Sequence, residues 1–366
     1  MRVLHVYAGN LYGGVEAMLA TLARARGAVP EMETRFALAY DGRLAEELRE
    51  AGAPPVILGG ARLSRPWSVW AARRRFARTL AADRPDVALF HSAWSHGIFA
   101  PAARKAGVRV AFWLHDAPAG DAAEARARRT PPDVGICTSA WVRERFPRLF
   151  RGIVPEVVHP AVAAPADFPA ERAAVREALS TGADDVVIVQ ASRMEPWKGR
   201  RVHLEALARL GDRPRWSCWM AGGAQRPHEQ AHVEEMRALA ERLGIARRVR
   251  WLGERADVPR LLAAADLLCQ PNLGPEPFGI TYVEAMYAGL PVVAAATGGA
   301  LEIVTADTGL LVPAGDAPSL AGALRTLAAD PALRARLGAA GPARAAELCD
   351  PARQLRRLHD LLGGEP

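Results

Sequence analysis

The chain has 366 residues, of which 50% are hydrophobic and 24% are charged, and this composition is that of a soluble globular protein. The length exceeds the size at which a single hydrophobic core stops growing, so two domains are expected. The formal net charge of +7 favours anionic partners such as nucleotides, phospholipid surfaces or nucleic acid, without choosing among them.

The N-terminal run 1–9 is too short for a signal peptide, and no later segment approaches the length that spans a membrane. The cysteines lie far apart without C-x-x-C or metal-site spacing, which indicates buried free thiols in a reducing compartment. They are Cys137, Cys218, Cys269 and Cys349. A cytoplasmic protein is therefore expected.

Short apolar runs alternate with amphipathic stretches along the first half of the chain, which is typical of strand-helix units and parallel sheets. The strands predicted there are 2–9, 33–40, 54–60, 86–92, 109–115, 133–139 and 156–162. A segment near residue 160 with three prolines predicts a linker. The second series of predicted strands is 185–192, 215–223, 248–254, 265–271, 291–296 and 308–315.

These two series predict an α/β protein made of two Rossmann-like parallel-sheet domains that face each other across a cleft. The predicted boundaries are 1–160 for the N-terminal domain and 161–345 for the C-terminal domain. Ligands of such sheets bind beyond the carboxyl ends of the strands, so polar residues that follow strands are the site candidates.

Gly13 and Gly14 follow the first predicted strand and open a helix. Such an entry lets backbone N–H groups approach an anion at the positive helix end. The pair does not form G-x-G-x-x-G, and a plain strand-to-helix turn explains it equally well.

The stretch QASRMEPWKGR, residues 190–200, presents Arg193 and Lys198 in a loop that leads into a helix. Two cations at a helix N-terminus are suited to a diphosphate, although a solvated basic loop is the usual meaning of such a cluster. Of the 47 lysines and arginines only two, Lys105 and Lys198, are lysines. Because a merely solvated position in this chain would almost always be arginine, the lysine favours a specific role.

The stretch EPFGITYVEAM, residues 276–286, places Glu276 before a predicted helix and Glu284 in its second turn. Both carboxylates are expected at the crevice end of the sheet, where they can accept hydrogen bonds from a polyhydroxylated ligand. Gly279 lets a ligand approach the backbone. Taken singly, Glu276 is more often an ordinary loop residue and Glu284 an ordinary solvated helix residue.

These segments together resemble the retaining, nucleotide-sugar-dependent glycosyltransferases of family 4, which have the GT-B fold. Besides E-x7-E, the resemblance rests on the segments GGVE (13–16), LHD (114–116), SRMEPWKG (192–199), ATGGALEIV (296–304) and TGLLVPAGD (308–316). They occur in the family's order and cover nearly the whole chain, most strongly from 186 to 316.

The resemblance implies a role for each matching residue. Glu284 is expected to hold the ribose of the donor, and Glu276 to lie beside the donor sugar. Arg193 and Lys198 are expected to grip the diphosphate, which stabilises the leaving group. The amides of Phe278, Gly279 and Ile280 are expected to meet the sugar hydroxyls, and Gly13 and Gly14 to form the glycine loop that approaches the same diphosphate.

His115 ends a predicted strand and matches the family's histidine near the donor hexose, whereas a lone histidine in that place is more often a core residue. Asp116 is expected either to orient His115 or to cap the next turn. His91 and His159 are further candidates. The turn after the linker strand reads HPAV instead of the family's N-G-V-D, so a donor contact there is in doubt.

The implied reaction transfers a hexose from a nucleoside-diphosphate sugar to a hydroxyl of a sugar, lipid-linked or small-molecule acceptor with retention of configuration. Bacterial polysaccharide, glycolipid or glycosylated-metabolite synthesis is the expected setting. The chain has no D-x-D pair, so neither a metal ion nor another cofactor is expected. The final helical run 346–366 is expected to cross back to the N-terminal domain.

The segment 62–80 combines Trp67 and Trp70 with several arginines. One interpretation is an interfacial helix on an anionic membrane at the inner membrane face. The favoured interpretation is a core-facing stripe of Val69, Ala72, Phe76 and Leu80 with a solvated arginine face.

Other classes of protein fit these residues less well than a transferase does. A sugar-nucleotide epimerase has no use for a separate acceptor surface, and a non-catalytic nucleotide-sugar sensor need not keep His115. A nucleic-acid partner is not expected, because the arginines are spread over most helices instead of lying with aromatic residues on one face.

Overall fold

The structure is a computed structural model that describes residues 1–10, 12–165, 171–211, 215–224 and 226–364. The chain divides into two compact units. Unit 1 comprises Met1–Ala163 and Cys349–Pro366, and unit 2 comprises Ala164–Leu348. Part of the predicted linker, residues 166–170, lies outside the described residues.

Unit 1 is built on a parallel sheet with the strand order β3-β2-β1-β4-β5-β6-β7. Its strands are β1 (Arg2–Tyr7), β2 (Glu33–Leu38), β3 (Val56–Ile57), β4 (Val87–Phe90), β5 (Arg109–Leu114), β6 (Val134–Cys137) and β7 (Glu156–Val157). The order reverses between β1 and β4. Ligands of doubly wound sheets bind at such a reversal, beyond the carboxyl ends of the strands.

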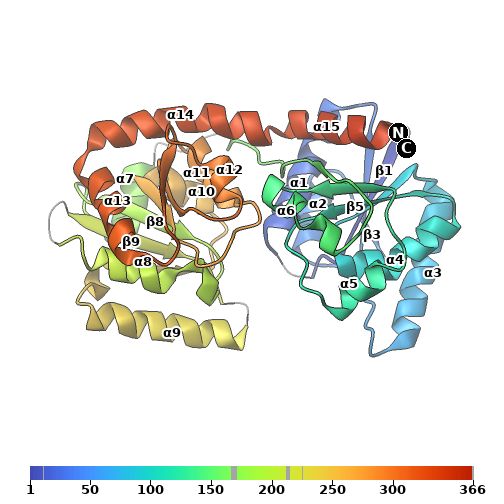
Figure 1. Cartoon of the computed structure of the whole chain (residues 1–366), viewed down its shortest axis with the longest axis horizontal. Coiled ribbons are helices and arrows are strands. Elements are labelled where there is room, and N and C mark those ends of the chain that lie inside the picture. The colour runs from blue at the N-terminus through green and yellow to red at the C-terminus, as the bar shows by residue number, and fades with distance from the viewer. Residues whose placement is uncertain (11, 166–170, 212–214, 225, 365–366) are drawn as a thin grey trace. The chain divides into compact units, whose positions relative to one another are not determined.

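Helices cover both faces of this sheet (Figure 1). They are α1 (Gly14–Ala25), α2 (Arg43–Glu50), α3 (Pro66–Asp83), α4 (Ala93–Lys105), α5 (Ala122–Ala127), α6 (Ala140–Arg143) and α15 (Pro351–Gly363), with the 3₁₀ turns η1 (Arg26–Ala28) and η2 (Phe146–Arg148). The C-terminal α15 buries Leu355, Leu358 and Leu362 in the same core cluster as residues of α1 and α2. An apolar stripe with a period near 3.6 residues explains this packing.

Unit 2 has a second parallel sheet, with the order β10-β9-β8-β11-β12-β13. Its strands are β8 (Val186–Ala191), β9 (Trp216–Ala221), β10 (Val249–Gly253), β11 (Leu267–Gln270), β12 (Val292–Ala295) and β13 (Gly309–Val312). Its helices are α7 (Arg172–Ala178), α8 (Arg200–Leu207), α9 (Pro227–Arg242), α10 (Val258–Ala264), α11 (Ile280–Tyr287), α12 (Ala300–Ile303), α13 (Ala317–Ala329) and α14 (Pro331–Cys349), with η3 (Pro196–Lys198) and η4 (Ala246–Arg248). Here the order reverses between β8 and β11.

Each strand range predicted from the sequence contains a strand of one of these sheets, and the prediction of two Rossmann-like parallel-sheet domains is confirmed. The strands β3 and β7 are shorter than predicted. Both lie at an edge of the sheet and pair with a single neighbour. Because Pro54, Pro55 and Pro160 lie in the predicted ranges and have no N–H to donate, the ladders are short there.

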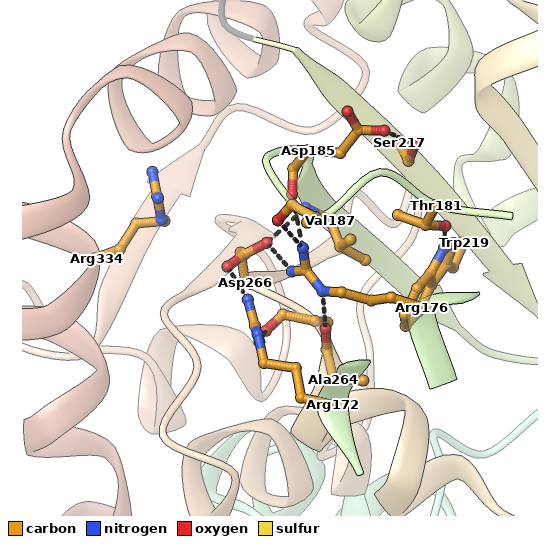
Figure 2. Close-up of polar contacts among 12 residues, drawn as sticks. Arg172, Arg176, Thr181, Asp185, Val187, Ser217, Trp219, Ala264, Asp266 and Arg334 are labelled. Atoms are coloured by element: carbon orange, nitrogen blue, oxygen red, sulfur yellow. Dashed lines mark hydrogen bonds and ion pairs between the residues drawn. The ribbon is translucent and has the colours of Figure 1, made fainter. Parts of the chain in front are cut away.

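A charged network ties α7 to the amino-terminal edge of the unit 2 sheet (Figure 2). The buried Arg176 donates to the carboxylate of Asp266 at 2.6 Å and to the carbonyl oxygens of Ala264 and Asp185 at 3.0 Å. Asp266 also accepts from the backbone N–H of Val187 at 2.7 Å. The network joins the starts of β8 and β11, so it holds together the strands whose opposite ends carry the candidate site.

The four cysteines are buried free thiols. Across the described part of the chain, none of the helices combines the length and the apolar character needed to span a membrane.

Candidate functional site

Two loops at the carboxyl edge of the unit 2 sheet meet through an ion pair. Lys198 ends η3 after β8, and Glu276 lies in the loop between β11 and α11. The Nζ atom of Lys198 lies 2.6 Å from Oε2 of Glu276 and 3.8 Å from the ring centroid of Trp197. The lysine is only 9% exposed, so its charge is held in a partly dry setting, where electrostatic interactions are stronger than in bulk water.

Further contacts fix Glu276 in place. The amide of Asn272 donates to Oε2 at 2.6 Å, and the backbone N–H of Gly299 donates to the Glu276 carbonyl oxygen at 2.7 Å. A Cβ atom on Gly298 would lie 2.3 Å from that carbonyl oxygen, so only glycine permits this approach. The TGGA stretch after β12 is thus a backbone support for Glu276.

Arg193 and Lys198, which the sequence pairs on one diphosphate, have different partners in the structure. Arg193 lies 2.8 Å from the carboxylate of Glu229, a fully buried residue in the first turn of α9, and 3.4 Å from Glu195. Sequence reasoning missed Glu229. The sequence feature that could have indicated it is its position three residues after Arg226 at the start of a helix. In the structure the Glu229 carboxylate also accepts the backbone N–H of Arg226.

Arg200 is a second residue that sequence reasoning missed. It is fully buried at the start of α8 and donates to the carbonyl oxygens of Ser192 at 2.6 Å and Arg193 at 2.8 Å. Burial lowers its pKa to about 10, so it stays charged at neutral pH. The Gln190 amide donates to the Lys198 carbonyl oxygen at 2.8 Å. Together these bonds hold both ends of the loop that carries Arg193 and Lys198.

Gly199 is the point where this loop approaches the next one. Its φ of +73° is left-handed, and a Cβ atom would lie 1.8 Å from the carbonyl oxygen of Pro271, directly after β11. A side chain at this position would therefore push the β8 and β11 loops apart.

We expect Gly199→Ala to lower the melting temperature of the protein and to weaken binding of a ligand held by these two loops at least about tenfold, because backbone strain of about 1–3 kcal/mol adds to the displaced loops. Gly244→Ala is the matched control, since Gly244 has a φ of +72° and nothing within 4 Å of the added Cβ atom. The Gly244→Ala variant has the cost of a positive φ at alanine but no close contact, so we expect it to leave ligand binding unchanged. Equal binding by both variants would contradict the close-approach role of Gly199.

The E-x7-E segment forms the start of α11. Gly279 caps the helix with a φ of +107°, where a Cβ atom would lie 2.3 Å from the ring of Tyr282. Phe278 is buried, and Ile280 is the first helical residue. Glu284 lies half-buried in the second turn, and burial raises its pKa to about 7. Hydrogen bonds donated to this carboxylate would favour its ionised form.

The candidates of unit 1 follow β1 and β5. Gly13 is the N-cap of α1 with extended backbone, and Gly14 is its first residue. Nε2 of His115 lies 3.0 Å from Nδ1 of His91, and burial lowers the pKa of His115 to about 3, so the ring is neutral. The carboxylate of Asp116 accepts the backbone N–H of Ala117 at 2.6 Å.

His159 takes no part in the hydrogen bond between His91 and His115. Its Nδ1 donates to the Thr138 carbonyl oxygen at 3.0 Å, which is a structural contact at the end of β6. Within the separate units, the structure thus joins Lys198 with Glu276 and His91 with His115.

The fold of the chain is similar to that of solved glycosyltransferase structures. The chain superposes on Alr3699/HepE of Anabaena, solved in complex with UDP and with UDP-glucose, with a TM-score of 0.85 and 26% identity over 99% of this chain. The lipopolysaccharide glycosyltransferase WaaG shares the fold at a TM-score of 0.73 and 18% identity. The two Rossmann-like units have the GT-B architecture of these structures.

Sequence comparison identifies the family. Residues 12–164 match the model of Glycosyltransferase Family 4, and residues 171–344 match that of Glycosyl transferases group 1. A GDP-mannose-dependent alpha-(1-6)-phosphatidylinositol monomannoside mannosyltransferase of Mycolicibacterium smegmatis is 30% identical over 310 residues, 79% of each chain. The chain belongs to glycosyltransferase family 4.

Another relative is similar over a shorter region. The D-inositol 3-phosphate glycosyltransferase of Kribbella flavida is 35% identical over 196 residues, which is 50% of this chain and 45% of that relative. The match thus spans less than half the length of that relative.

Proposed function

We propose that this protein is a retaining glycosyltransferase that moves a hexose from a nucleoside-diphosphate sugar to an acceptor hydroxyl. The observation that carries the proposal is the Lys198–Glu276 pair, held between the β8 and β11 loops beside the start of α11. The UDP-glucose complex of Alr3699/HepE and the GDP-mannose dependence named for the mycobacterial relative support a nucleotide sugar as donor.

In this proposal the cationic residues stabilise the leaving diphosphate. The bond between the anomeric carbon and the diphosphate oxygen breaks, and a bond from the same face to the acceptor oxygen forms. The acceptor proton passes to the departing phosphate oxygen, so the products are the glycoside and the nucleoside diphosphate. An ammonium group has three donors, so Lys198 can hold Glu276 and a phosphate oxygen together.

The other residues bind the donor. Glu284 accepts hydrogen bonds from the ribose hydroxyls, and Glu276 with the amides of Phe278, Gly279 and Ile280 meets the hexose. Arg193 reaches the diphosphate from its pair with Glu229, and the glycine loop at Gly14 binds the same anion. His115 contacts the hexose.

The proposal is tested with purified protein and a panel that contains UDP-glucose, UDP-galactose, GDP-mannose and ADP-glucose. A transferase is expected to be stabilised against heat by one donor and to release its nucleoside diphosphate slowly, with EDTA leaving the rate unchanged. Conversion of the donor to an isomer would identify an epimerase. Stabilisation without any release of diphosphate, in the presence of candidate acceptors, would favour a nucleotide-sugar sensor.

The helix α3 offers a surface for a lipid-linked acceptor. Its core-facing stripe is as the sequence predicts, with Ala72, Phe76 and Leu80 buried and Val69 partly buried against the same core. Trp67 and Trp70 lie outside that stripe and are 68% and 63% exposed. The guanidinium of Arg74 stacks over the Trp70 ring, 5.4 Å from its centroid. We propose that this end of α3 contacts an anionic membrane surface, since tryptophan and arginine suit the interface between water and lipid.

We expect the protein to sediment with vesicles that contain phosphatidylglycerol and not with pure phosphatidylcholine vesicles. The double variant Trp67→Ala/Trp70→Ala should bind the anionic vesicles at least about tenfold more weakly, because two large apolar side chains no longer enter the lipid. Leu301→Ala is the control, since Leu301 is a similarly exposed apolar residue of unit 2. Equal sedimentation of the tryptophan variant and the control would contradict membrane contact through α3.

A further inference from the structure

Three histidines form a hydrogen-bonded row across neighbouring strands of unit 1. His5 lies in β1, His91 directly follows β4, and His115 directly follows β5. Nδ1 of His5 lies 2.9 Å from Nε2 of His91, and Nδ1 of His91 lies 3.0 Å from Nε2 of His115. The strands β1, β4 and β5 are consecutive in the sheet, so the row crosses the point where the strand order reverses.

Neighbouring rings of the row are nearly parallel, and aromatic side chains pack against its two outer rings. The His5 and His91 rings are 5.1 Å apart and inclined by 9°, and the His91 and His115 rings are 5.3 Å apart and inclined by 19°. Phe36 stacks on His5, and the fully buried Trp113 stacks on His115. The side chains therefore cannot turn to exchange partners without disturbing packed aromatic residues.

All three rings are neutral, because burial lowers the pKa of each histidine far below 7. A neutral imidazole carries one N–H donor and one bare acceptor nitrogen. With two bonds in series, the hydrogens of the whole row must point the same way. Either every ring donates toward His115, or every ring donates toward His5.

The buried end of the row distinguishes these two arrangements. Nε2 of His5 is buried and has no hydrogen-bond partner among the described residues. If the row donates toward His5, this atom is an N–H without an acceptor, which is a rare feature of protein interiors. If the row donates toward His115, the same atom is a bare nitrogen, and an unsatisfied acceptor is tolerated more often than an unsatisfied N–H.

We propose that His91, backed by His5, is a positioning residue that keeps the hydrogen of His115 on Nδ1, so that His115 donates a hydrogen bond to an oxygen of the bound ligand. His5 Nδ1–H donates to His91, and His91 Nδ1–H donates to Nε2 of His115. The identity of the ligand as a nucleotide sugar rests on the proposed function, whereas the direction of the row does not.

The direction is measured by ¹⁵N NMR of histidine-labelled protein without substrate, because protonated and bare ring nitrogens have well-separated shifts. The protein supplies two internal references. Nε2 of His96 donates to the Thr130 carbonyl oxygen at 2.7 Å, and Nδ1 of His159 donates to that of Thr138 at 3.0 Å. The signal of His115 is assigned by its loss in His115→Gln. A protonated Nδ1 on His115 is expected, and a protonated Nε2 would overturn the proposal.

Two nearly isosteric variants separate positioning from packing. In His91→Asn the side-chain amide can donate to Nε2 of His115 from the place of the imidazole Nδ1, so the hydrogen should stay on Nδ1 of His115 and kcat should remain within a few-fold of wild type. In His91→Asp the carboxylate only accepts, so the hydrogen should move to Nε2 and kcat should fall at least about tenfold, as for other imidazoles held in the wrong tautomer. A purely structural role predicts equal effects of both variants.

The ¹⁵N NMR spectra test the proposal by themselves, without any measurement of transferase activity. If His91→Asp leaves the hydrogen of His115 on Nδ1, His91 does not set the tautomer and the proposal is wrong. If His91→Asp does not fold, the wild-type and His91→Asn spectra still test the direction. The spectra are recorded without a sugar donor. A protein that transfers no sugar could therefore still contain the histidine row as proposed, so the proposed function and the proposed row can fail independently.

Discussion

Replacement of Lys198 by alanine is expected to lower kcat/KM for the nucleotide-sugar donor about hundredfold, the scale of a lost charge that stabilises a leaving group. Lys198 is nearly buried beside Glu276, so a cation dissolved in the solvent cannot take the place of its ammonium group. Both kcat and donor binding should fall, because the same ammonium group meets the diphosphate before and during departure. Initial rates of nucleoside diphosphate release and a donor titration measure the two effects.

Lys105→Ala provides the matched control, since Lys105 is the other lysine of the chain and lies exposed at the end of α4. It should leave donor binding and turnover unchanged. The Lys198→Arg variant asks whether charge alone suffices: the guanidinium is larger than the ammonium group and does not fit its place between Glu276 and Trp197, so only partial recovery is expected. Donor affinity equal to wild type in Lys198→Ala would rule out the diphosphate role.

Donor affinity is expected to rise about tenfold between pH 6 and pH 8, because Glu284 ionises in this range. Burial raises its pKa to about 7, so at pH 6 most molecules carry the neutral carboxyl group and at pH 8 most carry the carboxylate. The carboxylate accepts from both ribose hydroxyls, whereas the neutral group offers fewer acceptor sites. The diphosphate of a nucleotide sugar is esterified at both ends and does not titrate in this window.

Glu284→Gln should remove most of this pH dependence and bind the donor at pH 8 at least about tenfold more weakly than wild type. Glu241→Gln, at an exposed position of α9, is the control and should retain the wild-type profile. Isothermal titration at several pH values measures the profile. A flat profile for the wild type, or an unchanged one for Glu284→Gln, would contradict the ribose assignment.

Much of the fold could be predicted from local patterns. Short apolar runs identified each strand in the described part of the chain, since a strand buried on both faces is continuously apolar. The edge strands β3 and β7 were predicted too long, because the predicted ranges included Pro54, Pro55 and Pro160, which have no N–H to donate to a ladder. Glu284 and Gly279 could be placed at the start of α11 because both belong to one short segment.

The partners of the site residues could not be predicted in this way. No local pattern indicated that Arg193 pairs with Glu229, 36 positions away, or that Lys198 pairs with Glu276, 78 positions away. Arg200 reads as an ordinary helical arginine until its burial against the Ser192 carbonyl oxygen is known. His5 gave no signal, because a histidine inside an apolar strand is usually a core residue.

The sequence by itself determined which segments are strands, which residues follow them and which family the motifs resemble, because these features depend on neighbours within a few residues. Only the tertiary structure decided which of those residues share a hydrogen bond. The order of strands in a sheet is set by long-range packing, and that order placed His5 beside His91, 86 positions later. The bonded row of histidines and the lysine-glutamate pair are consequences of sheet topology.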